Sequence, residues 1–350
     1  MPHLSRTFAR FSRQKFIESH HNSTKSWVLQ GWQPVRTLTN QEVRNKRCLI
    51  YDQEKLRQES LIRRIEKIQV IRKGPTEDLT LIMNKNLSTP YNCAMHDNEI
   101  YMDQSILALV NGKPWDMHRP LVEDCQLDFL HFRDDNPLAC NKAYWRSCSF
   151  ILGHVLETAF KSRHYVELCS FPAPNVKSGS FVYDVDLKLD KWRPSSGELI
   201  ALTQIATGLM AEELRFQRLD VDASLAVDMF KDNQYKSQQI PAIAAKSETG
   251  NNVTLYRVKD HIDISNGPMI SNTSQIGRYS IVGVNPIDTP DYGCLFRIQG
   301  LSTPKQLWVD WWTWDILLER AAKLNKSTYP SLIGFESRQS LPDTVKDNRS

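Results

Sequence analysis

The spacing of apolar and polar residues changes along the chain and predicts three kinds of segment. Residues 41–67 carry sparse apolar positions among alternating charges, which is typical of a helix that faces solvent or a partner. Residues 67–133 instead carry short apolar runs between turn residues, and Asn111 and Gly112 tolerate the positive φ angles of a tight turn. The elements expected there are strands at 68–71 and 79–83, a short helix at 90–96, and apolar segments at 106–110 and 125–132.

A longer helical periodicity follows from residue 138. Residues 138–160 place apolar side chains along one stripe, which is most simply a core-facing helix. The pattern Ser195-x-x-Glu198 is a capping box and predicts a helix over residues 198–217. A further helix is expected at 223–232, and strands at 180–186, 255–258, 279–284 and 295–299. The pattern predicts an α+β protein in which residues 67–133 form a small β-grasp-like unit.

Basic residues are concentrated near the start of the 350-residue chain. Residues 1–48 hold nine Lys or Arg against two Glu, which leaves 35 basic and 38 acidic residues in the rest. Residues 1–17 are Arg-rich, amphipathic as a helix and free of acids before Glu18, as in a mitochondrial presequence. An ordinary basic tail is the alternative. We expect residues 1–30 to be a presequence and arm, followed by a charged helical extension at 31–66.

RNA contacts, if present, are expected to be local, because the folded body is nearly neutral. The candidates are basic residues of the charged helix and of the strand after it: Arg44, Lys46, Arg47, Arg57, Arg63, Arg64, Lys67, Arg72 and Lys73. A merely soluble surface helix is the alternative.

Tryptophan is concentrated in residues 307–315, which hold four of the nine in the chain and open a helix expected to run to about residue 324. Large amphipathic rings are favoured at protein interfaces. The interface candidates are Trp308, Trp311, Trp312 and Trp314. Packing against their own domain is the alternative, and a disordered tail is expected to complete residues 303–350.

The cysteine spacing and the length of the apolar runs argue against three other classes: disulfide-rich secreted proteins, zinc-ribbon proteins and integral membrane proteins. The seven cysteines form no C-x-x-C pair, so we expect reduced, mostly buried thiols rather than a disulfide framework or a zinc ribbon. No apolar run reaches the about 18 residues that a membrane span needs.

Several blocks of sequence resemble the front part of threonyl-tRNA synthetase. SILALVNGKPWDMHRPLVEDCQLDFLHF, within residues 67–133, resembles the TGS module of that enzyme. Within residues 134–302, the editing domain is resembled by YWRSCSFILGHVLETAF, SGSFVYDVDL, VDASLAVDMFKDNQYK, HIDISNGPMISNTSQIG and LFRIQGLSTP, in the family's order. LTLIMNKNLSTPYNCAMH and AYWRSC resemble more closely a non-enzymatic relative, the family of mitochondrial large-ribosomal-subunit protein thirty-nine.

The editing-domain pattern carries His-x-x-x-His and, later, Cys-x-x-x-His. Aligned through neighbouring residues, the corresponding positions here are Arg146, Phe150, Ser265 and Met269. None of these side chains is a suitable base or metal ligand, so the resemblance implies a degenerate site with no catalytic residue, metal or cofactor. A shifted pair of His154 and His261 is the alternative.

The resemblance implies a structural component of the mitochondrial ribosome, in the matrix, that supports mitochondrial translation. Its expected partners are large-subunit rRNA and neighbouring ribosomal proteins, with no membrane span and no small-molecule substrate. Too few residues follow position 302 for an aminoacylation domain. A stand-alone trans-editing hydrolase of mischarged tRNA is the alternative function, and a free RNA-binding regulator is a third.

Overall fold

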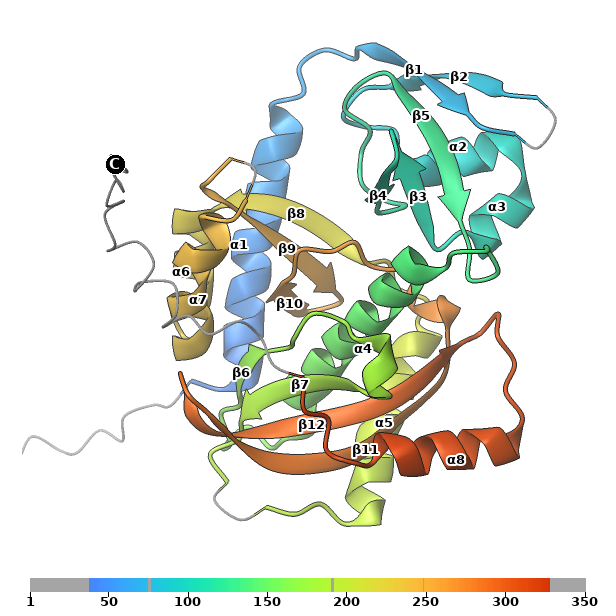
Figure 1. Ribbon diagram of the computed structural model, residues 1–350. Helices are drawn as coiled ribbons and strands as arrows, with labels where there is room; N and C mark the ends of the chain where they lie inside the picture. Colours follow the sequence, from blue (N-terminus) through green and yellow to red (C-terminus); the bar gives the residue numbers. More distant parts are fainter. Residues whose placement is uncertain (1–37, 75–76, 190–191, 248, 328–350) are drawn as a thin grey trace, which may run out of the picture. The chain divides into compact units, whose positions relative to one another are not determined.

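The computed structural model describes residues 38–74, 77–189, 192–247 and 249–327. In this part of the chain α-helices combine with three β-sheets, which confirms the predicted α+β class (Figure 1). The predicted presequence and arm at residues 1–30, and most of the predicted tail, lie outside the described residues.

Helix α1 (Asn40–Ser60) begins at a capping box in which Thr39 and Glu42 bond each other's backbone N–H groups. One face of α1 is buried, and Tyr51 on that face joins a hydrophobic cluster with residues of α6 (Ala223–Phe230) and α7 (Gln234–Ala244). The predicted solvated or partner-facing character therefore holds only for the outer face of α1, where Leu49 and Leu56 are exposed.

Residues 67–130 form a five-stranded sheet with their own hydrophobic core. The strand order is β2-β1-β5-β3-β4, and β1 pairs with β5 in parallel while the other pairs are antiparallel. Asn111 and Gly112 have φ angles of 48° and 76°, as predicted for the turn between β3 and β4. The elements of this unit are β1 (Lys67–Arg72), β2 (Leu79–Asn84), α2 (Pro90–Asp97), α3 (Glu99–Gln104), β3 (Leu107–Val110), β4 (Lys113–Trp115) and β5 (Cys125–Leu130).

The largest core lies on a four-stranded antiparallel sheet with the order β11-β12-β7-β6. Helices α4 and α5 pack on one face through residues such as Ile298, while Gln299 faces α8 and donates hydrogen bonds to carbonyls at its C-terminal end. The elements are α4 (Leu138–Ala159), β6 (Glu167–Ser170), β7 (Phe181–Asp186), α5 (Ser196–Ala211), β11 (Ile276–Thr289), β12 (Gly293–Pro304) and α8 (Trp311–Ala321), with 3₁₀ turns at Val176–Ser178 and Thr273–Gln275.

A three-stranded antiparallel sheet, β10-β9-β8, packs with α1, α6 and α7. Its strands are β8 (Gln217–Asp222), β9 (Asn252–Val258) and β10 (His261–Ile264). The capping box at Ser195 and Glu198 is confirmed, but α5 ends at Ala211 and not at residue 217, because Gln217 already begins β8.

Most of the cysteines are buried, as the sequence analysis expected. Five of the seven are buried, with Cys48 intermediate and Cys294 exposed. None of the helices in the described ranges is long and apolar enough to cross a bilayer.

Candidate functional site

The four positions that correspond to the editing pattern lie on two facing segments. Arg146 and Phe150 are one turn apart on α4, and Ser265 and Met269 lie in the segment after β10. The Nη1 atom of Arg146 donates a hydrogen bond to the Pro268 carbonyl at 2.8 Å, which ties the two segments together. The four positions are therefore brought into one neighbourhood.

None of these side chains offers a general base or a metal ligand. Phe150 is fully buried and packs edge-on against His261, with ring centroids 4.7 Å apart. Met269 is also fully buried, and its sulfur lies 3.5 Å from the Ser147 hydroxyl. Burial lowers the pKa of the Arg146 guanidinium, which still remains protonated near neutral pH. An aromatic ring and a thioether fill the space between α4 and the facing segment.

The shifted histidine pair is also present in this region. His154 and His261 are both buried, with ring centroids 6.0 Å apart. Burial, and next the nearby His261, lower the pKa of His154 to about 4. His261 places Nδ1 2.7 Å from Glu157 Oε2, which is the geometry of a histidine–carboxylate dyad. His154 is therefore neutral at physiological pH, as a base would need to be.

The dyad is enclosed by α1 and by the backbone of α4. Arg47 of α1 forms an ion pair with the second carboxylate oxygen of Glu157 at 2.8 Å. Burial alone would raise the pKa of Glu157, but the Arg47 and His261 charges outweigh burial and hold this pKa at about 2. A Cβ atom at Gly153 would lie 3.0 Å from His261 Nε2, and the His261 side chain is fully buried, so this ring nitrogen faces packed protein.

Arg44 of α1 also helps to enclose the histidine pair. Its Nη1 donates to the Glu157 carbonyl at 2.5 Å, and its Nε lies 2.9 Å from Asp260 Oδ2, on the turn that precedes His261. Helix α1 therefore joins α4 to the β9–β10 turn across the histidine pair. This arrangement supports packing and not substrate entry.

A second buried ionic group lies nearby and is also internally satisfied. Lys236 of α7 pairs with Asp263 of β10 at 2.6 Å, and both side chains are almost fully buried. Tyr183 donates to Asp263 and accepts from Lys236 at 3.1 Å. Burial raises the pKa of Tyr183 well above its usual value, so its phenol stays protonated. Among the described residues, no group of three or more His, Cys, Asp or Glu is placed to hold a metal ion.

Three of the RNA-contact candidates need correction. Arg44, Arg47 and Arg72 are buried and form ion pairs inside the protein, Arg72 with Asp97. A buried guanidinium that already faces a carboxylate has no free side to present to a phosphate, so these three are not RNA contacts.

The other candidates lie at the surface. Lys46 and Lys73 pair with Asp232 and Asp78, and Arg57 pairs with Glu54 on its own helix. Arg63, Arg64 and Lys67 are exposed in the segment that leads from α1 into β1, and no ion pair within the described ranges engages them. These six remain accessible to a polyanion; Arg63 and Arg64 form no ion pair among the described residues, and Lys67 only donates a hydrogen bond to Asn84.

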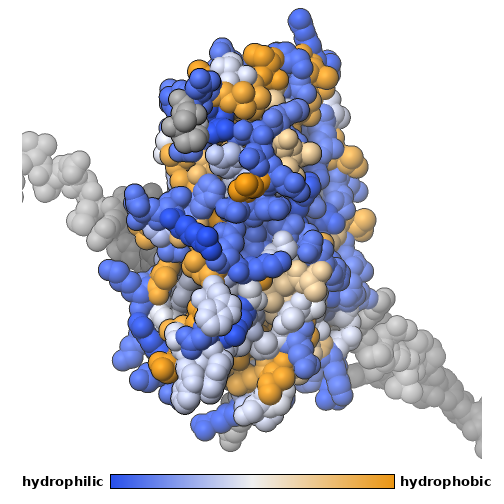
Figure 2. Space-filling model, turned by 90° about the vertical axis from the view of Figure 1, so that its right-hand side faces the viewer, coloured by the Kyte–Doolittle hydropathy of each residue, from blue (hydrophilic) through white to orange (hydrophobic). Residues whose placement is uncertain are grey.

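The tryptophan candidates divide into two groups. Trp308, Trp311 and Trp312 are 83%, 60% and 65% exposed, and the rings of Trp311 and Trp312 stack with centroids 4.5 Å apart. Trp314 is buried against Leu301, which is the own-domain packing that the sequence left open. Figure 2, which views the side of the molecule where α8 lies in Figure 1, shows apolar residues at the surface in separate groups among hydrophilic ones.

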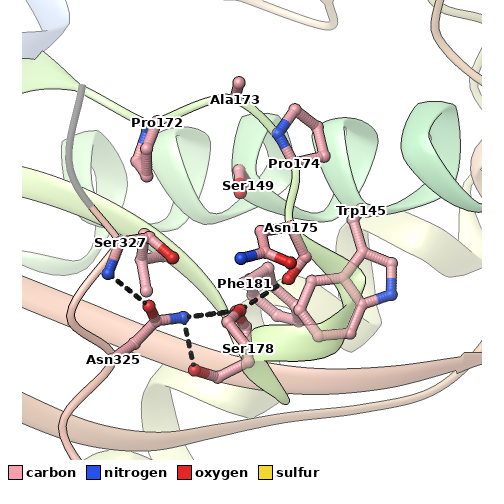
Figure 3. A pocket seen from close by; sticks show the side chains of 12 residues that line it. Trp145, Ser149, Pro172, Ala173, Pro174, Asn175, Ser178, Phe181, Asn325 and Ser327 are labelled. Carbon is pink, nitrogen blue, oxygen red and sulfur yellow. Dashed lines mark hydrogen bonds between the residues drawn. The ribbon is translucent and has the colours of Figure 1, made fainter. Parts of the chain in front are cut away.

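One hollow lies beside α8, and another lies beside residues that follow this helix in the chain. An apolar groove of about 440 Å³ is lined by α5, β11 and α8, including Ile200 and Leu318. The other, shown in Figure 3, lies beside Trp145 and Asn325 and has a volume of about 10 Å³. Asn325 donates to Ser178 Oγ at 3.0 Å there, and the space admits about one water and no larger ligand.

The sequence analysis missed several members of these networks. Glu157 is three residues from His154 on α4, a spacing that places both on one helical face and could have been noticed. Asp260 and Asp116 carried no local signal, because their partners lie more than 100 residues away in the chain.

Comparison with known proteins identifies the family. No protein-family model matches the chain. The large ribosomal subunit protein mL39 of Drosophila melanogaster is 45% identical over 298 residues, which cover 85% of this chain and 89% of the fly protein. The cytoplasmic threonine–tRNA ligase 2 of Bos taurus is 30% identical over 237 residues, which cover 67% of this chain but only 30% of the ligase. The human cytoplasmic threonine–tRNA ligase 1 is also 30% identical, over 28% of its length.

The two kinds of relative differ in how much of their length is shared. The mL39 match extends over most of both proteins, whereas the chain spans less than a third of the ligases. The similarity to the synthetases is therefore distant and partial. The chain belongs to the mL39 family of large-ribosomal-subunit proteins, which is a family of ribosomal proteins and not of enzymes.

Proposed function

We propose that this protein is a structural component of the mitochondrial large ribosomal subunit, located in the matrix, that binds large-subunit rRNA and neighbouring ribosomal proteins. The observation that carries the proposal is the 45% identity to fly mL39 over 89% of that protein. The enclosed histidine pair and the four replaced editing positions support a role in binding rather than catalysis. In this role the protein supports mitochondrial translation.

We further propose a domain organisation that matches this ancestry. Residues 67–133 would be a TGS-like β-grasp domain, which is supported by a five-stranded sheet and a hydrophobic core of their own. Residues 134–302 would be a degenerate editing-like domain, supported by the partial match to the ligases. Residues 1–30, 31–66 and 303–350 would be a presequence with an arm, a helical extension, and a Trp-rich helix with its tail.

The proposed contacts use two kinds of surface. Arg63, Arg64 and Lys67 would meet rRNA phosphates, because they are exposed cations in one short segment. Trp308 and Trp312 would meet a neighbouring ribosomal protein, because exposed tryptophans are favoured as interface anchors. The groove between α5 and α8 adjoins this helix and adds apolar area to the same surface.

Gradient sedimentation of mitochondrial extract tests the proposed function. The full chain, expressed at its natural level, is expected to sediment with the large subunit in stoichiometric amount, with no free pool. A chain that remains in the light fractions would contradict the proposal and favour a free RNA-binding regulator.

The alternative function is tested with purified full-length protein and mischarged threonine tRNA. We expect no turnover, because His261 is fully buried and its Nε2 atom is shielded from solvent. Sustained multiple-turnover ester hydrolysis would overturn the structural role. Its loss in His154→Gln or His261→Gln would then assign the activity to the histidine pair.

A further inference from the structure

Three arginines surround a buried carboxylate where the connection after β4 meets β8, β9 and the segment after β10. Asp116 accepts hydrogen bonds from the Tyr256 hydroxyl at 2.8 Å and from the Met269 backbone N–H at 2.8 Å. Arg218 Nη1 lies 3.5 Å from the same carboxylate, and Arg218 also pairs with Asp220 at 3.0 Å. The negative charge of Asp116 is therefore already shared among three partners.

Arg119 lies in this cluster near Asp116 and Asp220, but it forms no close ion pair with either carboxylate. Its guanidinium carbon is 3.5 Å from the centre of the Trp115 ring, and its side chain is only partly exposed. Within the described ranges, no hydrogen bond or ion pair engages this guanidinium. Burial lowers the pKa of Arg119 and the charge of Arg218 lowers it further, while the Asp220 and Asp116 charges offset this shift only in part.

Arg146 is in a similar position on α4. Its single hydrogen bond goes to the Pro268 carbonyl, and no carboxylate among the described residues lies within ion-pair distance. Burial is again the main reason that its pKa falls. A guanidinium has five N–H donors, so Arg119 and Arg146 together hold many unused donors at partly shielded sites. Keeping unpaired charges in such sites is unfavourable, and a bound anion would relieve the cost.

The surroundings of the cluster favour RNA as that anion. Arg215, which is exposed, lies over the ring of Tyr91 at 5.3 Å, and Tyr91 packs against His118 at 4.8 Å, next to Arg119 in sequence. Arginines interleaved with aromatic rings suit a strand with a phosphate at every nucleotide and bases that can stack. A single carboxylate could neutralise one guanidinium but would leave the other unpaired.

We infer that Arg119 and Arg146 form a binding site for the phosphodiester backbone of RNA, with Arg215 at its edge. This inference rests on the proposed ribosomal function and places an RNA contact away from the segment that carries Arg63 and Arg64. The site lies beside the degenerate editing positions, since Arg146 is one of them. The site uses the positive charge of Arg146, which stands where the editing pattern has a histidine. It requires no catalytic step.

The test measures binding of the purified full chain to a labelled oligouridylate of about 20 nucleotides across about 50 to 200 mM KCl. The double variant Arg119→Met, Arg146→Met is expected to bind about tenfold more weakly, with a salt slope reduced by about 0.7 for each lost contact. Methionine keeps much of the apolar stem of arginine. The double variant is therefore expected to melt at the same temperature as the wild type or higher.

Arg163→Met is the matched control, because Arg163 is exposed beyond the far end of α4, at least 13 helical residues or about 20 Å from Arg146. Its binding is expected to equal that of the wild type. The proposed site would be contradicted if the wild type did not bind oligouridylate, or if the double variant bound it as well as the wild type does. A double variant that melts markedly lower would show that the two arginines are structural.

Two further readouts distinguish an RNA site from a site for an acidic protein and from the ribosomal role as a whole. Binding of polyglutamate, lost in the double variant and without RNA binding, would identify an acidic protein partner and overturn the RNA assignment. Sedimentation with the large subunit tests the proposed function independently. A chain that sediments with the subunit but does not bind oligouridylate would retain its ribosomal role and lose this site.

Discussion

Arg47 of α1 and Glu157 of α4 form an ion pair of 2.8 Å in which both side chains are almost completely shielded from water. The pair joins residues 110 positions apart in the sequence. Because Glu157 also accepts from His261, this ion pair connects the helical extension directly to the enclosed histidines. Its contribution to stability can be measured.

Replacing Arg47 with methionine is expected to lower the free energy of unfolding by about 3 kcal/mol, because Glu157 is left buried without its main partner. Urea denaturation near neutral pH measures the change. Lys231→Met is the control, since Lys231 pairs with Asp228 at the surface, where each side chain is 54% exposed. That change is expected to leave the free energy of unfolding essentially unchanged, because solvent screens an exposed ion pair. Equal losses in the two variants would contradict the assignment.

Stability is expected to fall in mild acid partly because of His118. Burial and the Arg215 charge lower the pKa of His118 to about 4, compared with 6.5 for an unperturbed histidine. Between these two pH values His118 is protonated in the unfolded chain but stays neutral in the folded protein. The stability present above about pH 6.5 is therefore lost as the pH falls toward 4. From about pH 7 to about pH 5 the loss is about 2 kcal/mol.

Urea unfolding of the wild type and of His118→Gln at both pH values isolates this contribution. His154 and the other titrating groups are common to both proteins, so the difference between the two profiles reports His118 alone. The variant is expected to lose about 2 kcal/mol less than the wild type. Parallel profiles would show that His118 titrates normally in the folded protein.

Gly267→Ala is expected to cost about 3 kcal/mol or more, because Gly267 has a φ of 61° and a Cβ atom there would overlap the Tyr256 hydroxyl. Gly250→Ala is the matched control, with a φ of 75° and open space around its Cβ position. It is expected to cost only about 1 kcal/mol, from the backbone conformation. Thermal denaturation of both variants compares the two effects. If the costs were the same, close packing against Tyr256 would not be the cause.

The exposed and buried tryptophans of the C-terminal helix are expected to respond differently. Trp308→Ser with Trp312→Ser should reduce incorporation into the large subunit while the melting temperature stays unchanged, because both rings are exposed. Trp314→Ala should instead destabilise the protein by about 3 kcal/mol through the cavity that it leaves. Gradient sedimentation and thermal denaturation measure the two effects. Normal incorporation of the double variant would remove these rings from the proposed interface.

The sequence alone predicted those helices and strands whose defining residues lie within the element or next to it. Helix α4 could be predicted almost to the residue, because its apolar stripe has a helical period and it starts directly after Pro137. The predicted end of α5, at residue 217, was later than the observed end at Ala211, because neither glycine nor proline marks the end of this helix. Glu213 takes the left-handed conformation there, with a φ of 53°, a position that glycine usually occupies.

Strand β8 and helix α7 were missed for different reasons. In β8, Arg218 and Asp220 lie on one face and neutralise each other, so the strand resembles a solvated segment in sequence. Helix α7 was not predicted because Pro241 lies inside it, and proline usually ends or kinks a helix.

The site could be predicted only in part. The replaced positions followed from the resemblance, and the structure places them on facing segments. Their closure by α1 could not be predicted, because the carboxylates that pair with Arg44 and Arg47 lie 110 or more residues later in the chain. A basic residue on an amphipathic helix looks the same whether it will meet a phosphate or a carboxylate that is still to come.

The order of synthesis gives this arrangement a temporal consequence. In α1, Arg47 is synthesised 110 residues before Glu157, and Arg44 is synthesised 216 residues before Asp260. At about 5 to 20 residues per second, the helix waits about 10 to 40 s for the last of these acids. The neighbouring small sheet can fold meanwhile from contacts within its own residues. Among the helices of the described ranges, α1 is thus the first to be made, and we expect it to be among the last to dock, since its arginines lack their acidic partners until the β9–β10 turn is complete.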